Sequence, residues 1–255
     1  STFQRVLNNA ADNGWNYVWC ELQNDPPDDR KVETIGLTAA KVMSRVSGIK
    51  QKEITVDSGL VTAAIDLGKY ACHWGVVDWV EGLTGRVANY GVAEVHGTGT
   101  ETDRTQTHMA IRSSLMRWRE ELLGGELCDR KPDIVLIDSG DFTDVVYSFV
   151  KEVQDGTNTF FAIKGLSPYR TYRDIAGKTI TGHHWHANLQ PKAGVWLYSL
   201  DSDGLKSLVH QMWATPTFDE AQQFSPLSLS LFSAFGQDGK PDTRRHRAFA
   251  KHQVA

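Results

Sequence analysis

The sequence predicts an α/β domain built on one mixed sheet, in which three antiparallel strands precede parallel strands and helices cover the faces. Residues 61–66 alternate with the period of a strand, and Gly68 permits a turn into a second strand at 74–80. After Asp133, the residues IVLI up to Ile137 form a continuous apolar run, typical of a strand buried on both faces. A helix and another strand follow, and that order predicts a parallel pair with a right-handed crossover.

The composition is that of a globular chain. Its 255 residues are 40% hydrophobic, enough for one large domain or a medium domain with an appendage. No apolar run is long enough for a membrane helix and no secretory leader is evident, so we expect no membrane association. The net charge of −4 argues against a generally basic nucleic-acid-binding surface but permits a local basic groove. The three cysteines lie far apart, which fits a reducing compartment.

The first part of the chain is expected to be a linker. Residues 21–31, ELQNDPPDDRK, combine two prolines with clustered acids and interrupt a helical pattern. A short helix is expected at 38–46, and we place the compact domain from about residue 55 onward. After the hairpin, we expect a third strand at 86–95 and a helix at 108–123 that stops at two glycines.

The second half continues with alternating element types. We expect a helix that starts at Asp141 or Thr143 and stops at Gly156, and then a strand at 159–163. Residues 168–200 resemble an inserted β-hairpin, and a short helix is expected at 205–213. Beyond Pro216 the periodicity fades.

Three aspartates share one setting. Asp66, Asp138 and Asp201 each lie within or at the end of an apolar strand, and the last two are closely followed by a helix. A single strand-end aspartate usually has a structural role. Carboxylates that converge from several strands, however, are stable only when protonated or when cations lie between them. Two divalent ions held about 3.5–4 Å apart by carboxylates are the recurrent apparatus of phosphodiester hydrolysis.

The order of strands, helices and acids resembles the ribonuclease-H-like fold. The local sequence more specifically resembles the C-terminal nuclease domain of tailed-phage terminase large subunits of the lambda type. The matching segments are ELQNDP, LVTAAIDLG followed by WGVVDW, VLIDSGDFTDVVYSFV, FFAIKG, LYSLDSDGLK and HRAFAKHQ. Each segment is weak evidence alone, but together they follow one another in order across most of residues 20–253.

The resemblance implies a set of site residues. Asp66, Asp138 and Asp201 would be the catalytic metal ligands for two Mg²⁺ or Mn²⁺ ions. Asp203 would be a substitute or fourth ligand, because one residue of register turns a strand side chain to the opposite face. Basic residues would position the DNA backbone: Lys164, Arg170, Arg173, Arg244, Arg245 and Arg247.

The implied function is a metal-dependent endonuclease that cuts double-stranded viral DNA during genome packaging. Portal protein and the small terminase subunit would be its partners, in the host cytoplasm at the procapsid portal, and the isolated domain is expected to be monomeric. No G-x-x-x-x-G-K-[ST] motif occurs, so residues 1–54 would be a linker and the tail of an ATPase domain, and residues 55–255 the nuclease. A further acid would follow Ala255.

A phosphotransferase is the first alternative. IDLGKYACHW and IDSGDFTDVV resemble the two phosphate loops of actin-like ATPases and sugar kinases, which share the same core fold. In those enzymes the first aspartate interacts with the metal ion of a bound metal–nucleotide complex, and the chemistry is phosphoryl transfer. That superfamily needs two such domains and a glycine-rich adenosine motif, and residues 139–200 contain neither.

A non-catalytic DNA-binding or docking module is the second alternative. Its support is the basic run between Lys240 and Lys251, which a solvated surface explains equally well. His184 and His186 have the spacing of a strand face and could bind zinc, but no third ligand is evident in the sequence. An exposed strand is therefore the preferred reading of that segment.

Overall fold

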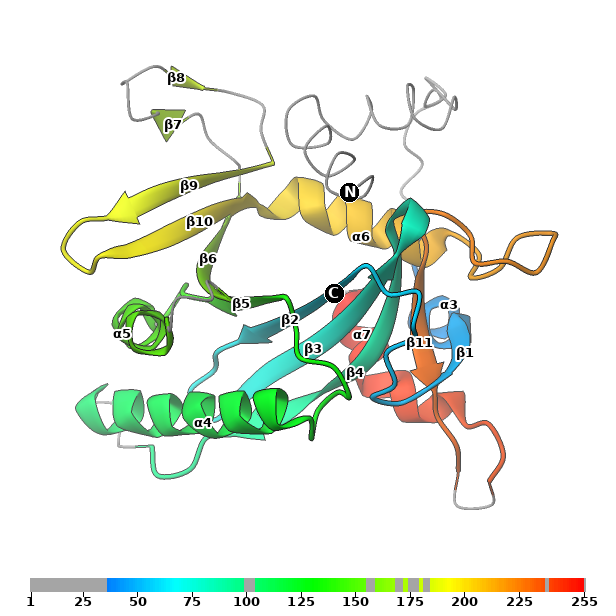
Figure 1. The fold of residues 1–255 in the computed structure, drawn as a ribbon, viewed down its shortest axis with the longest axis horizontal. Coiled ribbons are helices and arrows are strands. Elements are labelled where there is room, and N and C mark those ends of the chain that lie inside the picture. Colours follow the sequence, from blue (N-terminus) through cyan, green and yellow to red (C-terminus); the bar gives the residue numbers. More distant parts are fainter. Residues whose placement is uncertain are drawn as a thin grey trace.

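The computed structural model describes residues 36–98, 104–154, 159–167, 172–173, 179–180, 184–236 and 239–254, with the backbone alone at 172–173 and 179–180. A nine-stranded sheet crosses the molecule in the order β1-β11-β4-β3-β2-β5-β6-β10-β9 (Figure 1). Its strands are β1 (Val46–Lys50), β2 (Leu60–Asp66), β3 (Ala71–Val80), β4 (Thr84–Glu94), β5 (Ile134–Asp138), β6 (Phe160–Leu166), β9 (Trp185–Gln190), β10 (Val195–Asp201) and β11 (Leu229–Ser233). A separate pair joins β7 (Tyr172–Arg173) and β8 (Thr179–Ile180).

The centre of the sheet confirms the predicted ribonuclease-H-like class. Strands β2, β3 and β4 form an antiparallel meander, and β2 then pairs in parallel with β5, which pairs in parallel with β6. The resulting order, β4-β3-β2-β5-β6, is the arrangement that the sequence predicted from three antiparallel strands, a crossover helix and a parallel strand pair.

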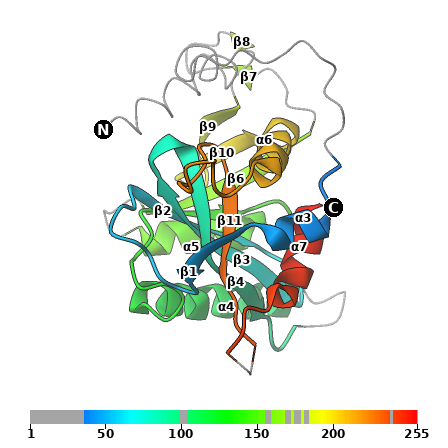
Figure 2. The ribbon, with the colours of Figure 1, turned by 90° about the vertical axis from the view of Figure 1, so that its right-hand side faces the viewer.

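Helices cover the two faces of the sheet differently (Figures 1 and 2). One face, called here the α4 face, is covered by two helices, and the other, the α6 face, by three. The helices are α3 (Ala39–Ser44), α4 (Arg104–Gly124), α5 (Thr143–Val153), α6 (Ser202–Ala214) and α7 (Arg247–Gln253), with 3-10 turns η2 (Glu81–Leu83) and η3 (Thr243–His246). Helices α4 and α5 cover the α4 face, while α3, α6 and α7 cover part of the α6 face.

Alternation along β2 assigns its side chains to these faces. Val61, Ala63 and Ile65 are buried in the larger core with residues of α4 and α5. The intervening residues, which end at Asp66, therefore point to the α6 face. A smaller core on the α6 face packs Trp213 of α6 against Leu231 of β11.

The later chain differs from the prediction in two respects. A separate strand pair, β7 and β8, lies within the predicted insertion, but the insertion is shorter than 168–200. The run 195–201 belongs to the main sheet and not to an insertion, because β10 pairs in parallel with β6 and β9 forms the edge beside it. Regular structure also continues beyond Pro216, since β11 lies between β1 and β4 and α7 follows. Strand β11 was missed because its alternation is hidden: Ser230 and Leu231 are both fully buried.

The fold extends N-terminal of the predicted boundary at residue 55. Strand β1 pairs in parallel with β11, and α3 packs beside α7. The assignment of the residues before α3 to the tail of an ATPase domain stays a prediction. None of the described helices is long and apolar enough to cross a bilayer.

Buried His246 fixes the start of α7. Its Nδ1 lies 2.8 Å from the Tyr90 hydroxyl, and its Nε2 lies 3.1 Å from the Phe232 carbonyl oxygen. Because a carbonyl can only accept, Nε2 carries the proton, and Nδ1 accepts from Tyr90. Burial is the main cause that lowers the pKa of His246, so the neutral ring is favoured. The helix is thereby tied to β4 and β11.

We expect this lowered pKa to make folding acid-sensitive. A histidine with a depressed folded-state pKa contributes its stability above the unfolded value of about 6.5 and loses it as the pH falls through the folded value. His246→Gln should lower the free energy of unfolding by about 1–2 kcal/mol at pH 7.5 and flatten the pH dependence below 6.5. Thermal melts from pH 5 to 8 measure both effects. His96→Gln, at an exposed position, is the control, and equal pH slopes in His246→Gln and wild type would contradict the assignment.

Candidate active site

Asp66 and Asp138 lie side by side on the α6 face. The parallel pairing of β2 with β5 runs through Ile65 opposite Ile137, so the next residue of each strand is an aspartate at the same level. Because both isoleucines are buried on the α4 face, both aspartates point to the opposite side. We call these two residues the acidic pair.

The environment of Asp138 favours its protonated form. Burial is the largest cause that raises the pKa of its carboxyl group, and the negative charges of Asp66 and Asp141 raise it further. The backbone N–H groups of Ser139 and Gly140 act in the opposite direction, and the nitrogen of Gly140 lies 3.2 Å from Asp138 Oδ1. A cation near both carboxylates would offset their mutual repulsion and the cost of burying the Asp138 charge.

A cleft of about 580 Å³ opens beside the acidic pair. Its floor is the α6 face of the central strands and its walls come from α6 and α7. The floor includes Thr62 and Leu136, whereas Trp213 and Phe249 line the walls. The cleft is therefore largely apolar and has its charged groups at the carboxyl ends of β2 and β5.

Two histidines that the sequence analysis did not single out also line this cleft. His73 is opposite Asp66 in the β2–β3 pairing, and the rings of His73 and His252 lie 5.1 Å apart between centroids. The register of the predicted hairpin could have placed His73 beside Asp66. No local signal could have placed His252, because α7 reaches the site only through tertiary packing.

Asp201 lies apart from the acidic pair. Asp138 is level with Ile163, which is level with Tyr198, so Asp201 stands three residues farther along and two strands across. These offsets correspond to about 10 Å in each direction. Strand alternation also turns Asp201 toward the α4 face. Successive side chains of a strand point to opposite faces, and Asp201 is an odd number of residues beyond Tyr198, so the two side chains lie on opposite faces.

Both later acids have local partners instead. Asp201 accepts a hydrogen bond from the backbone nitrogen of Gly204 at 3.0 Å and so caps α6, and its Oδ2 lies 3.7 Å from His184 Nδ1. Asp203 accepts from the Ser167 hydroxyl at 2.7 Å. Within the described part of the chain, no three metal-binding side chains come together. The predicted role of Asp201 and Asp203 as ligands thus has no support from this geometry.

None of the four predicted DNA-binding residues whose side chains the structure describes lines the cleft beside the acidic pair. Lys164 is exposed, but alternation along β6 directs it to the α4 face. Arg244 pairs with Asp242 at 2.8 Å, and Arg245 donates to the Phe235 carbonyl oxygen at 2.9 Å. Arg247 is exposed at the start of α7. Arg170 and the side chain of Arg173 lie outside the described residues.

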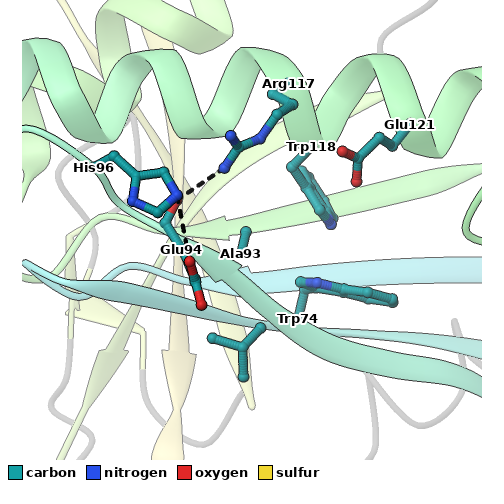
Figure 3. Close-up of a pocket in the computed structure, with 8 residues that line it drawn as sticks. Trp74, Ala93, Glu94, His96, Arg117, Trp118 and Glu121 are labelled. Carbon is teal, nitrogen blue, oxygen red and sulfur yellow. Dashed lines mark hydrogen bonds and ion pairs between the residues drawn. The ribbon is translucent and has the colours of Figure 1, made fainter.

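A second recess, of about 350 Å³, lies between β4 and α4 (Figure 3). Two of its polar side chains contact Glu94: Arg117 donates to the Glu94 backbone carbonyl oxygen at 2.9 Å, and His96 Nε2 lies 3.3 Å from the Glu94 carboxylate. Figure 3 shows the nitrogen-bearing end of buried Trp118 directed toward Trp74. This recess opens on the α4 face, away from the acidic pair.

Comparison with known proteins gives one family match. Residues 28–226 match the model of the terminase large subunit gpA endonuclease domain. A comparison with curated protein sequences finds no match.

Similarity to solved structures is weak. The chain aligns over 41% of its length with an exopolyphosphatase from Cytophaga hutchinsonii (18% identity, TM-score 0.28), an Aquifex aeolicus member of the Ppx/GppA family (11%, 0.27) and T. thermophilus RuvC in complex with a Holliday junction substrate (19%, 0.24). It covers 34%, 35% and 63% of those chains, respectively. At these TM-scores the similarities carry no argument about function.

We expect the apo protein to gain stability when the repulsion within the acidic pair is removed. A carboxyl group with a raised folded-state pKa stabilises the fold below its unfolded value of about 3.9 and loses that contribution as the pH rises. Asp138→Asn should therefore raise Tm at pH 7.5 in EDTA by roughly 2–4 °C, the shift that about 1 kcal/mol produces in a domain of this size. The gain should vanish near pH 3. Asp144→Asn, at an exposed position of α5, is the control. A lower Tm for Asp138→Asn at pH 7.5 would contradict the argument.

Proposed function

Because the chain belongs to the family of terminase large subunit gpA endonuclease domains, we propose that it is a metal-dependent endonuclease that cuts double-stranded DNA during viral genome packaging. The observation that carries this proposal is the acidic pair at the carboxyl ends of two parallel strands, beside an open cleft. The family match favours a nuclease over the phosphotransferase and the non-catalytic module.

The acidic pair fits a hard divalent cation. Its donors are carboxylate oxygens, which Mg²⁺ and Mn²⁺ prefer, and Asp138 is in a setting that disfavours an uncompensated negative charge. Asp66 and Asp138 would hold the metal, and water and phosphate oxygens would complete its coordination. When bound, two such ions activate water for attack on phosphorus and stabilise the departing 3′ oxygen.

The residues around the acidic pair would orient the DNA. His73 and His252 lie on the same side of the sheet and offer ring N–H groups that can donate to phosphate oxygens. Their rings come from β3 and α7, so a phosphate beside Asp66 would be contacted from two elements. Lys164, Arg170 and Arg173 remain proposed contacts to the DNA backbone.

The biological setting follows from the family. We propose that the domain acts with an ATPase domain, the portal protein and the small terminase subunit, in the host cytoplasm at the procapsid portal. The double-stranded genome would be its substrate. Cleavage would leave 5′-phosphate and 3′-hydroxyl ends.

Plasmid nicking tests the proposed activity. The purified chain should convert supercoiled plasmid to nicked and linear forms with Mg²⁺ or Mn²⁺, and Asp66→Asn or Asp138→Asn should reduce the rate by more than about 100-fold. Even partners that only support a metal ligand cost about 10–100-fold when removed. Glu220→Gln, at an exposed position that does not line the cleft, should cut normally. Cleavage that survives both aspartate changes would sink the proposal.

Metal binding tests the site without requiring activity. Mn²⁺ at 100 times its dissociation constant should stabilise the wild-type protein by about 2.7 kcal/mol. Asp138→Asn should lose this metal-dependent rise in Tm. Asp203→Asn should keep it, because its carboxylate binds Ser167 and lies outside the acidic pair. Loss of the metal response in Asp203→Asn alone would instead restore the predicted ligand role of that residue.

A further inference from the structure

The α6 face continues past the acidic pair across β6, β10 and β9, and α6 contacts the first two of these strands. Register places Asp138 level with Ile163 and Ile163 level with Tyr198, and alternation keeps all three on the same face. Tyr198 therefore lies two strands from Asp138, or about 10 Å across the sheet. A ligand that passes the acidic pair in this direction meets the α6 face of β6, β10 and β9.

Aromatic side chains line this part of the face. The ring of Tyr198 lies 5.2 Å from that of Phe161 and 6.0 Å from that of Trp185, measured between centroids. Trp196 is on the same face of β10, two residues before Tyr198, and pairs with Leu189 of β9. We call Phe161, Trp185, Trp196 and Tyr198 the aromatic platform.

The platform is unusually exposed for tryptophan. Trp185 and Trp196 each retain 44% of their accessible surface, and Leu189 retains 49%. By contrast, Trp118 and Trp213 retain 1% each in the two cores. Because almost half of each of these two side chains is exposed on an edge hairpin, they contribute little to the hydrophobic core. Contiguous exposed aromatic surface of this kind marks an interaction site.

The chemistry of the platform matches nucleobases. All positions of the described strands β6, β9 and β10 on this face are uncharged, so none of these strand positions presents a carboxylate to a phosphate. Bases stack on aromatic rings irrespective of sequence, while their phosphates can remain in solvent. Duplex bases are already stacked on each other, so only an unpaired strand offers free base faces.

We propose that the aromatic platform binds the bases of an unpaired DNA strand and guides that strand to the acidic pair. Binding of the bases requires only the platform, whereas guidance of the strand to the acidic pair rests on the proposed nuclease function. The argument for DNA over a protein partner is continuity: Tyr198 and Asp138 share one face and one level of the sheet, in a chain that belongs to an endonuclease family.

Binding in EDTA separates the platform from catalysis. Fluorescence anisotropy would compare a labelled single-stranded oligothymidine with a blunt duplex of equal length. Trp185→Ala and Trp196→Ala should each weaken single-strand binding by roughly 5- to 150-fold, since a stacked base contributes about 1–3 kcal/mol. Duplex affinity should change less than about twofold. Trp185→Phe should retain most of the single-strand affinity, because it keeps a stacking ring.

Phe235→Ala provides the matched control. Phe235 is 44% exposed, as the two tryptophans are, but lies outside β6, β9 and β10. It should bind both DNA forms as wild type does. Unchanged single-strand binding in both tryptophan variants, or equal losses for single strand and duplex, would overturn the platform. Unchanged DNA binding with altered sedimentation would overturn it as well and identify a protein contact instead.

Failures of the two proposals give different results. If Asp66→Asn still nicks plasmid but single-strand binding depends on the tryptophans, the platform stands and the assignment of the acidic pair fails. If nicking depends on Asp66 but single-strand binding ignores both tryptophans, the platform alone fails.

Discussion

The parallel register between β2 and β5 is the constraint on which the candidate site depends. Ile65 and Ile137 are paired and buried against α4 and α5, and this packing holds Asp66 and Asp138 at the same level on the opposite face. A slip of one residue would send one carboxylate into the core. Core packing thus holds two like charges together, and the raised pKa of Asp138 is the electrostatic consequence. A divalent cation bound between the two carboxylates would attract both and so offset their mutual repulsion.

The unequal cover of the α6 face gives the site its shape. Helices α3 and α7 pack over the strands on one side of the acidic pair and α6 also contacts β6 and β10, while the tryptophans of β9 and β10 stay exposed on the other side. The acidic pair therefore stands at the border between an apolar cleft and an exposed sheet surface. The position of α7, which closes the cleft and carries His252, depends on the hydrogen bonds of buried His246 to β4 and β11.

Much of the fold was predictable because its central elements are local patterns. The period-two alternation of 61–66 and the glycine after it defined the hairpin. The apolar run ending at Asp138 defined a buried strand, and helical spacing defined α4 and α5. These patterns also fixed which side chains of β2 share a face. Strands β1 and β11 escaped prediction because each finds its partner far away in the sequence, and β11 in addition hides its alternation.

The sequence by itself therefore determined the ribonuclease-H-like core and the two acids that end β2 and β5. Only the tertiary structure decided that Asp201 caps α6 instead of joining them, that His73 and His252 meet beside Asp66, and that the aromatic rings of β6, β9 and β10 share the face of the acidic pair. The physical reason is that periodicity reports the face of a side chain within its own element. The level of one strand against another is set by packing between residues that the sequence does not place side by side.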